Sequence, residues 1–345
     1  MPLSNPGAVV SQQEERVAEG MESSAPYPAS GITSYAQNRE DILLWRALHD
    51  VEDGFYFDVG AQDPSDDSVT RAFYDRGWHG INIEPAAGYF EKLCEERVRD
   101  LTLQVALGDC AGWGTLYEFP DTGLSTLVKR VATRHRANGF DCVDRRIEIL
   151  TLATIWEKFV KGEVHFLKID VEGFEGRVLA GAELARFRPW IILVEATEPL
   201  TSEGAWEDWE PILLGARYKF VHFDGLNRWY LAEERSNLEV KFEAPPNIFD
   251  GFQLASVVSL QHRAAEAECK VSQMQASAVQ AECKAKQMQA SVAEAECKVK
   301  QMQASASWRI TAPLRVANDC IHAAATRLLR ASRAAIDAFT ARRHR

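Results

Sequence analysis

Five short apolar runs, each about the length of one β-strand, alternate with longer amphipathic segments between residues 55 and 194. The runs are residues 55–59, 80–83, 101–107, 165–169 and 190–194. Runs such as FLKID and WIILVEA are continuously apolar, which is typical of strands covered on both faces by crossover helices. The pattern therefore predicts an α/β fold with a doubly wound, mostly parallel sheet. Segments 218–225 and 228–233 flank turn residues, and we expect them to form an antiparallel pair that closes this sheet.

The chain is acidic, and its 345 residues suffice for one large domain and a substantial extension. Its 39 Lys and Arg residues against 50 Asp and Glu residues give a net charge of -11, which disfavours nucleic acid as a partner. Seven cysteines, an odd number without a C-x-x-C pair, predict reduced thiols in a cytoplasmic protein and no metal site. Because the sequence lacks a run of about 18 apolar residues, we expect no membrane-spanning segment.

Composition divides the sequence into four parts. Residues 1–33 are polar and lack the basic start and apolar core of a signal peptide, so we expect a disordered leader. Residues 34–252 carry the β-α-β pattern, and Ser34 is expected to cap its first helix. Residues 253–307 contain a repeat and residues 308–345 form a basic tail, and both are expected to be helical.

Acidic residues stand at the ends of four of the predicted strands, namely Asp58, Glu84, Asp170 and Glu195. Ligands of a doubly wound sheet bind outside the carboxyl ends of its strands. Glu84 lies 24 residues beyond Gly60, where a carboxylate accepts hydrogen bonds from both hydroxyls of a ribose. This placement serves NAD and S-adenosylmethionine equally.

The first strand end, FYFDVGAQDP, distinguishes between these two cofactors. A dinucleotide site carries G-x-G-x-x-G at this point, whereas Gly60 stands alone here. Asp58, Asp63 and Asp170 would repel a pyrophosphate, but they suit a cofactor that carries a positive sulfonium. We therefore predict an S-adenosylmethionine site, with an NAD-dependent enzyme as the less favoured alternative.

Six ordered segments together resemble the FkbM family of S-adenosylmethionine-dependent methyltransferases. They are SYAQNREDILL, FYFDVGAQDP, GINIEP, DTGLSTL, FLKIDVEGFE and WIILVEAT. The resemblance covers roughly residues 34–252. It implies a class I methyltransferase fold, with a mostly parallel seven-stranded sheet whose last strand is antiparallel. It also implies O-methylation, commonly of sugar hydroxyls on secondary metabolites or surface polysaccharides.

The resemblance also implies a set of cofactor-binding residues: Asp58, Gly60, Ala61, Gln62, Glu84 and Asp109. Among these, Glu84 corresponds to the acid that holds the ribose, and Asp109 of ALGD stands where the adenine is usually contacted. The family more often has Asn at the position of Gln62, and a glycine often follows where this chain has Asp63-Pro64. The cofactor loop is therefore expected to differ locally from that of the family.

Methyl transfer to a hydroxyl requires a well-positioned oxygen and benefits from a base that accepts its proton. Asp170 and Glu172 leave a strand end beside the expected methyl group and are the first candidates, although Asp170 alternatively only orients the cofactor or the turn. His135 has an ordinary pKa of about 6.5 and is a third candidate, or else a solvated helix residue. Ser125 and Thr126 in DTGLSTL either line an acceptor pocket or belong to a plain turn.

Residues 264–305 consist of three consecutive 14-residue repeats, AAEAECKVSQMQAS, AVQAECKAKQMQAS and VAEAECKVKQMQAS. Small and apolar residues advance along them in alternating steps of four and three, which predicts the seam of a left-handed coiled coil. The seam residues are Ala267, Val271, Met274, Ala278, Ala281, Ala285, Met288, Val292, Ala295, Val299, Met302 and Ala306. A lone alanine-rich helix buries little, so we expect self-association, with a solitary surface helix as the alternative. A non-catalytic α/β scaffold assembled by this coil is the other alternative to an enzyme.

The tail from residue 308 onward begins SWRITAPLR and carries eight Arg against two Asp. Pro313 is expected to interrupt the helix. The residues beyond it predict an amphipathic helix, with an apolar face of Ile321, Ala324, Leu328, Leu329 and Ile336 and with Arg327, Arg330, Arg333, Arg342 and Arg343 around it. Such a helix suits an anionic membrane surface or an acidic partner, or it docks on the acidic remainder of the chain. We expect a cytoplasmic protein, either free or peripheral at the inner membrane surface.

Overall fold

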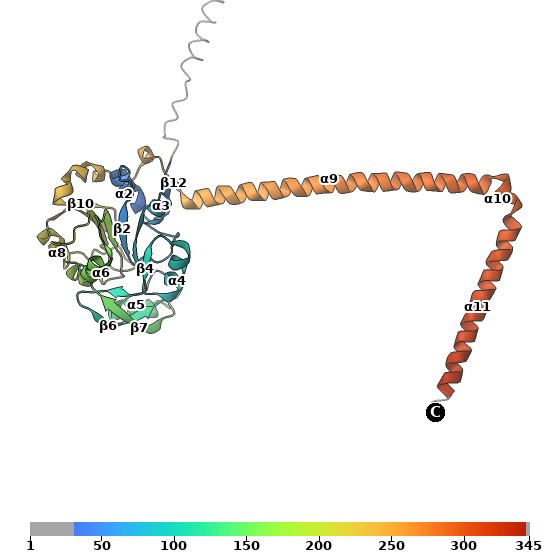
Figure 1. Ribbon diagram of the computed structural model, residues 1–345, viewed down its shortest axis with the longest axis horizontal. Coiled ribbons are helices and arrows are strands. Elements are labelled where there is room, and N and C mark those ends of the chain that lie inside the picture. Colours follow the sequence, from blue (N-terminus) through green and yellow to red (C-terminus); the bar gives the residue numbers. More distant parts are fainter. Residues whose placement is uncertain (1–30, 343–345) are drawn as a thin grey trace, which may run out of the picture. The chain divides into compact units, whose positions relative to one another are not determined.

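Seven strands form the central sheet of the protein (Figure 1). The structure is a computed structural model that describes residues 31–342. It describes their side chains too, apart from those of residues 308, 312 and 331–342. The order of the strands is β10-β11-β9-β8-β2-β3-β4. The strands are β2 (Phe55–Val59), β3 (His79–Ile83), β4 (Leu101–Leu103), β8 (Phe166–Ile169), β9 (Ile191–Glu195), β10 (Tyr218–Phe223) and β11 (Asn227–Ala232). Strands β4, β3, β2, β8 and β9 pair in parallel, whereas β11 is antiparallel to both β9 and β10. The predicted run at 55–59 is confirmed without change, and three other runs are confirmed to within one residue.

Helices cover both faces of this sheet, which explains why its strands read as continuous apolar runs. The helices of the domain are α2 (Glu40–Leu48), α3 (Arg71–Tyr74), α4 (Ala87–Glu96), α5 (Lys129–Ala137), α6 (Leu152–Phe159), α7 (Glu175–Ala180) and α8 (Glu210–Gly215). Phe57 and Leu167 belong to a core that includes residues of α6, α7 and α8. Tyr56 and Phe166, their neighbours in sequence, pack on the opposite face against residues of α2 and α3.

A smaller three-stranded sheet, in the order β5-β7-β6, adjoins the carboxyl ends of the central strands. Its strands are β5 (Ala106–Leu107), β6 (Gly112–Glu118) and β7 (Val143–Leu150). The single strand predicted over 101–107 is therefore wrong, because β4 pairs with β3 whereas β5 pairs with β7. The residues between the two strands carry the chain from one sheet to the other.

The beginning of the domain also differs from expectation. Ser34 does not cap a helix, because it lies in β1 (Thr33–Ser34), which pairs with β12 (Gln253–Leu254). Its hydroxyl donates to Asp41 Oδ1 at 2.8 Å, and helix α2 begins only at Glu40. Ile32 is buried, so the domain includes residues on both sides of the predicted limits 34 and 252. The rest of the predicted leader, residues 1–30, lies outside the described residues.

The described residues divide into two compact units, with the division between Gln261 and His262. Two 3₁₀ segments, η1 (Glu233–Phe242) and η2 (Ile248–Asp250), end the domain. Helix α9 (Ala255–Ala304) follows and contains nearly all of the repeats. The predicted helix is therefore confirmed, whereas the coiled coil stays a prediction. Helices α10 (Ala306–Ile310) and α11 (Ala312–Arg342) follow, and the predicted interruption near Pro313 occurs at Thr311. Within residues 31–342, no helix is both long and apolar enough to cross a membrane. The side chains of Ile336, Arg333, Arg342 and Arg343 in the predicted tail face lie outside the described residues.

Candidate active site

Two pockets meet at the carboxyl ends of the central strands. We call the first the β2–β3 pocket, because the ends of these strands line it together with the small sheet; it includes Gly60, Gln62, Glu84, Tyr89, Val105 and Leu107. We call the second the β8–β9 pocket; it includes Asp58, Ala61, Lys168, Leu193, Glu195 and Thr197. Gln62, Gly123, Asp170 and Glu172 line both pockets. The structure thus brings most of the predicted site residues to one edge of the sheet.

Gly60 forms a turn that only glycine can form at this position. Its φ is +80°, and a Cβ there would lie 1.8 Å from the carbonyl oxygen of Asp170. The backbone N–H groups of Gly60 and Ala61 both donate to Ile83 O, at 3.0 and 3.2 Å. Lys168 Nζ donates to Gly60 O at 2.6 Å. The turn is therefore held from the neighbouring strands on both sides.

Glu84 connects the two loops that border the β2–β3 pocket. Its Oε2 accepts the N–H of Gln62 and its Oε1 accepts the N–H of Ala86, both at 2.8 Å. Burial raises the pKa of this carboxyl to about 7, even though the two N–H donors favour the charged form. Each carboxylate oxygen can accept more than one hydrogen bond, so Glu84 retains acceptor capacity for a ligand.

Asp58 and Lys168 form the polar floor beneath the Gly60 turn. Asp58 is buried, and its Oδ2 accepts the hydroxyl hydrogen of Thr70 at 3.0 Å. Lys168 Nζ lies 3.4 Å from Asp58 Oδ1 and 3.5 Å from Asp170 Oδ2. Burial alone would lower the pKa of Lys168, but these two carboxylates raise it above its ordinary value. Lys168 therefore stays charged and links the motif turn to Asp170.

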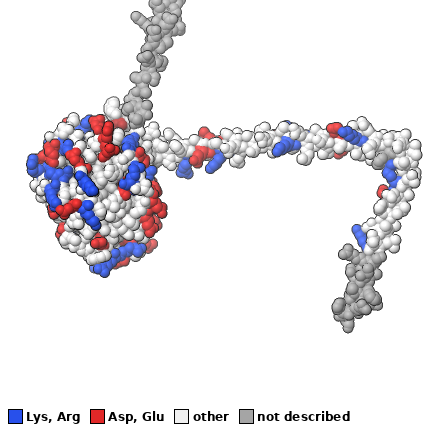
Figure 2. Space-filling model, viewed as in Figure 1, with Lys and Arg blue, Asp and Glu red and all other residues white. Residues whose placement is uncertain are grey.

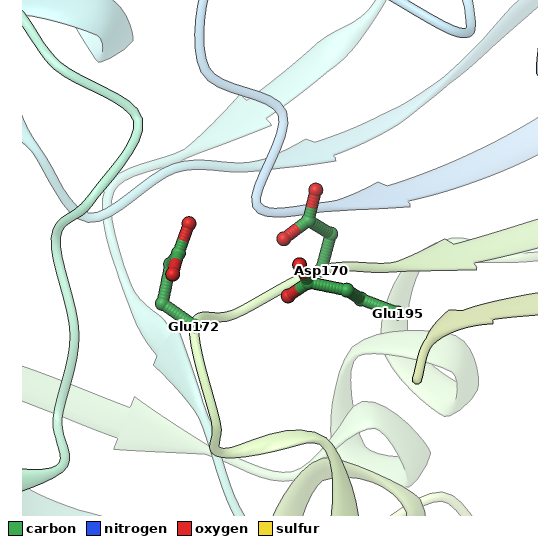
Figure 3. Close-up of side chains that lie close together, drawn as sticks. All are labelled: Asp170, Glu172 and Glu195. Carbon is green, nitrogen blue, oxygen red and sulfur yellow. The ribbon is translucent and has the colours of Figure 1, made fainter. Parts of the chain in front are cut away.

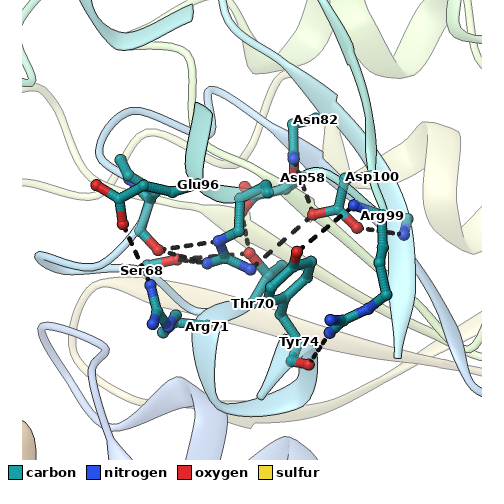
Figure 4. A network of polar contacts seen from close by, with 12 residues as sticks. Asp58, Ser68, Thr70, Arg71, Tyr74, Asn82, Glu96, Arg99 and Asp100 are labelled. Atoms are coloured by element: carbon teal, nitrogen blue, oxygen red, sulfur yellow. Dashed lines mark hydrogen bonds and ion pairs between the residues drawn. The ribbon is translucent and has the colours of Figure 1, made fainter. Parts of the chain in front are cut away.

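A network of polar side chains supports Asp58 from the other side (Figure 4). Thr70 lies 3.4 Å from Ser68, oxygen to oxygen, and Ser68 accepts a hydrogen bond from the buried guanidinium of Arg97 at 2.9 Å. The same guanidinium donates to Pro64 O at 2.6 Å. Arg97 thereby ties the loop that follows the first motif to the end of α4, which fixes the position of Asp58.

Three carboxylates from two strand ends converge where the pockets meet (Figure 3). Asp170 and Glu172 follow β8 and Glu195 ends β9, and each offers an oxygen within 4.8 Å of the others. Burial first, and then the charge of Asp170, raises the pKa of Glu172 to about 9 and that of Glu195 well above its ordinary value. Glu175, which accepts the N–H groups of Val171 and Gly173 at 3.1 Å each, holds the turn that presents Glu172.

Ser125 and Thr126 lie at the site. Both line the β2–β3 pocket, whereas Gly123 and Leu124 of the same loop reach the β8–β9 pocket. Ser125 Oγ accepts the N–H of Phe119 at 3.1 Å, and Thr126 Oγ1 donates to Glu172 O at 2.8 Å. These hydroxyls order the loop and join it to the Glu172 turn.

Two predicted site residues lie outside both pockets. Asp109 is exposed and pairs with Arg177 at 2.9 Å, while Ala106 and Leu107 line the β2–β3 pocket in its place. His135 is fully buried, so it is not a solvated helix residue, and its ring lies edge-on to Phe119 with centroids 5.3 Å apart. Burial also lowers its pKa. Neither residue is positioned to contact a ligand in the two pockets.

Two residues of the site, Lys168 and Glu195, were not predicted as site residues from the sequence. A single Lys within the apolar strand FLKID was a usable signal, because a charge on a strand covered by helices needs a buried partner. Glu195 was recognisable only as a strand end. Its proximity to Glu172 follows from the pairing of β8 with β9, which local sequence does not encode.

The chain is similar to a known family of methyltransferases. Residues 58–220 match the family model described as the methyltransferase FkbM domain. The methyltransferase FkbM structure from Methylobacillus flagellatus KT is 14% identical, with a TM-score of 0.34, over 54% of this chain and 47% of that chain. This chain thus spans about half the length of that protein. A TehB-like SAM-dependent methyltransferase from Corynebacterium glutamicum ATCC 13032 Kitasato is 7% identical, with a TM-score of 0.33, over 66% of this chain and 100% of that chain. No curated protein matches the chain significantly.

Proposed function

We propose that this protein, which carries an FkbM methyltransferase domain at residues 58–220, is an S-adenosylmethionine-dependent O-methyltransferase acting on a sugar hydroxyl. The observation that carries the proposal is the pairing of a ribose-type carboxylate, Glu84, with a second, polar pocket that begins at Asp170. One pocket suits a nucleoside cofactor, and the other suits a hydroxyl-rich acceptor. The two ligands would meet at Asp170 and Glu172.

The residues of the β2–β3 pocket fit S-adenosylmethionine. Glu84 has acceptor capacity left for the two ribose hydroxyls, and Ile83, Val105 and Leu107 offer an apolar surface for the adenine. Asp170 brings negative charge to the end of the pocket where a positive sulfonium would lie. The cofactor supplies an electrophilic methyl group, and the chain holds the acceptor oxygen against it.

Two carboxylates stand where a proton acceptor is needed. Asp170 and Glu172 line both pockets, so either one is within reach of an acceptor hydroxyl at the junction. Burial, followed by the charges of Asp170 and Glu175, raises the pKa of Glu172, which favours its protonated form in the empty site. We therefore assign the proton-accepting role to Asp170, which Lys168 positions at 3.5 Å, and an orienting role to Glu172.

The β8–β9 pocket narrows the class of acceptor. Its titratable lining residues are six acids and one base: Glu40, Asp58, Asp67, Asp170, Glu172, Glu195 and Lys168. A phosphate or carboxylate group would meet repulsion there. Hydroxyl groups have many acceptors to donate to, together with the side chains of Asn227 and Thr197. A neutral or amine-bearing sugar is the acceptor class that this lining favours.

Calorimetric titration of S-adenosylmethionine and NAD⁺ into wild-type protein and Glu84→Ala tests the cofactor assignment. We expect the wild type to bind S-adenosylmethionine with one-to-one stoichiometry and NAD⁺ much more weakly. Glu84→Ala should weaken S-adenosylmethionine binding by about 1.5–3 kcal/mol, because two charge-assisted hydrogen bonds are lost. Asp109→Ala is the matched control and should bind like wild type, since Asp109 lies outside both pockets.

Each contrary result points to a different error. If Glu84→Ala binds S-adenosylmethionine as tightly as the wild type, Glu84 is not part of the cofactor site. If the wild type binds NAD⁺ more tightly than S-adenosylmethionine, the protein is an NAD-dependent enzyme and not a methyltransferase. Transfer of labelled methyl groups to a panel of neutral and amino sugars then separates an enzyme from a non-catalytic scaffold that merely binds the cofactor.

A further inference from the structure

The carboxylates of Asp170 and Glu195 lie next to each other, and that of Glu172 lies across a small space from them (Figure 3). Their nearest oxygens all lie within 4.8 Å of one another, although the side chains come from two different strand ends. Like charges at this separation repel strongly in a partly buried site. Three ionised carboxylates this close to one another therefore need a cation between them.

Two of these side chains also have polar atoms without partners. Glu195 Oε2 and Glu172 Oε2 are shielded from solvent, and neither has a hydrogen-bond partner in the described part of the chain. Buried carboxylate oxygens are normally hydrogen-bonded or bound to a cation, because leaving them bare costs free energy. Both oxygens belong to carboxyl groups drawn in Figure 3.

The nearby lysine is already engaged and does not fill this role. Lys168 Nζ donates to Gly60 O at 2.6 Å and is shared between Asp58 and Asp170 at 3.4 and 3.5 Å. It is the one basic residue among the six acids that line the β8–β9 pocket. In the described part of the chain, no Lys or Arg forms an ion pair with Glu172 or Glu195, whereas Lys168 does so with Asp170.

We propose that Asp170, Glu172 and Glu195 bind one divalent cation at the junction of the two pockets. The ligands are all carboxylates, without sulfur or imidazole, which favours a hard cation such as Mg²⁺ or Mn²⁺. Three protein ligands leave further coordination positions for water and for an acceptor hydroxyl entering from the β8–β9 pocket.

The proposal rests on the proposed methyltransferase function and changes how the acceptor is activated. A cation that holds the acceptor hydroxyl lowers its pKa, so the proton leaves to solvent or to a carboxylate oxygen. The acceptor oxygen then forms its bond to the methyl carbon, and the electron pair of the broken sulfur–carbon bond remains on sulfur. The site thereby selects acceptors that present a hydroxyl with a second oxygen close by, as vicinal sugar diols do.

Titration of purified full-length protein with Mn²⁺, followed by the electron paramagnetic resonance of the free ion, tests the site without an acceptor. We expect the wild type to bind one equivalent, and Glu195→Gln to weaken this binding by about tenfold or more. Asp67→Asn is the matched control and should stay within about twofold. Asp67 lines the same pocket but lies outside the cluster, and Asn tolerates its φ of 55°.

The cation site is wrong if the wild type does not bind Mn²⁺ stoichiometrically, or if Glu195→Gln binds Mn²⁺ as tightly as the wild type. It is also wrong if Asp67→Asn weakens Mn²⁺ binding as much as Glu195→Gln does, because this would indicate diffuse attraction of Mn²⁺ to an acidic pocket. Thermal unfolding confirms that Glu195→Gln is folded, and Glu172→Gln replaces it if it is not. Titration of S-adenosylmethionine into the same samples separates the two proposals. If the protein binds the cofactor but not Mn²⁺, only the proposed cation site is wrong. If it binds Mn²⁺ but not the cofactor, only the proposed methyltransferase function is wrong.

Discussion

The central sheet and the repeat helix α9 differ in where their apolar side chains find a partner. Phe57, Leu167 and Leu193 in the sheet have no exposed surface, because helices of the same chain cover both faces. Along α9, by contrast, Val271 is 52% exposed and Met274 is 71% exposed, and the helix has no buried residue. A domain that buries its own core is stable alone, whereas a long helix with a bare apolar seam is stabilised by a surface outside itself.

We propose that a second copy of α9 provides this surface. The three repeats are nearly identical, so two parallel copies in register place the same residue types opposite each other along the whole seam. Figure 2 shows α9 as mostly uncharged, with its charged residues in separate groups. Lys286 and Lys298 pair within the helix, with Glu282 and Glu294, at 2.8 and 2.6 Å. These pairs leave the seam to be filled by Ala, Val and Met.

Replacing Met274, Met288 and Met302 together with Lys should have the largest effect and abolish self-association. The change places three charges against three others in the seam, and burying an unpaired charge costs about 3–5 kcal/mol, more than alanine contacts offset. Light scattering should show an oligomer for the wild type and a monomer for the variant. Lys at Gln273, Gln287 and Gln301, one residue earlier and off the seam, is the matched control and should remain oligomeric.

A wild-type protein that is already monomeric at micromolar concentration would contradict this proposal. The long helix would then be a spacer, and the contrast with the sheet would need another explanation.

Phe57→Ala should have the next largest effect, this time on the stability of the domain. Phe57 is fully buried and stacks on Trp156 with ring centroids 5.4 Å apart, so truncation leaves a cavity and lowers the free energy of unfolding by about 3–5 kcal/mol. Met288→Ala in α9 should leave the unfolding of the domain unchanged, because it removes no contact from the core. Urea denaturation followed by tryptophan fluorescence measures both variants, and equal destabilisation would mean that the helix and the domain unfold together.

The same comparison explains what could be predicted from the sequence. The limits of β2 and the helicity of the repeats follow from periodicity, since burial on two faces or along one stripe leaves a direct record in residue order. The carboxylates at strand ends could also be predicted to lie together, because parallel strands bring their carboxyl ends to one edge of the sheet. Glu84, Asp170 and Glu172 accordingly lie at one site.

What failed depends on contacts between distant segments. Residues 101–107 look like one apolar run, but pairing with β3 and with β7 divides them between two sheets. His135 looks like a polar helix residue, and only the packing of Phe119 and Phe140 around it reveals that it is buried. Ser34 resembles a helix cap in sequence, yet it lies in β1 and pairs with Leu254 of β12, far away in the chain. Each error arose where a tertiary contact overrode a local preference.

The smallest predicted effect is a pH dependence that should separate the domain from the helix again. Burial raises the pKa of Glu84 to about 7 in the empty pocket, and the ribose hydroxyls require its ionised form. S-adenosylmethionine should therefore bind up to about tenfold more tightly at pH 8 than at pH 6, as the ionised fraction rises from about one tenth to about nine tenths. Without the cofactor, the stability of the domain changes with pH in the opposite direction. The folded state retains a proton that the unfolded state releases above its ordinary pKa of 4.5, so this group stabilises the domain less as pH rises toward 7.

Calorimetric titrations at pH 6, 7 and 8 test this prediction in wild-type protein and in Glu84→Gln. The variant binds more weakly because it lacks the charge, and its affinity should vary much less with pH than that of the wild type. The oligomeric state should stay constant over the same range, because α9 contains no buried side chain that could change its charge. An equal pH dependence in both proteins would assign the titration to another buried acid, such as Glu40, whose pKa burial also raises to about 7 and which lines the β8–β9 pocket.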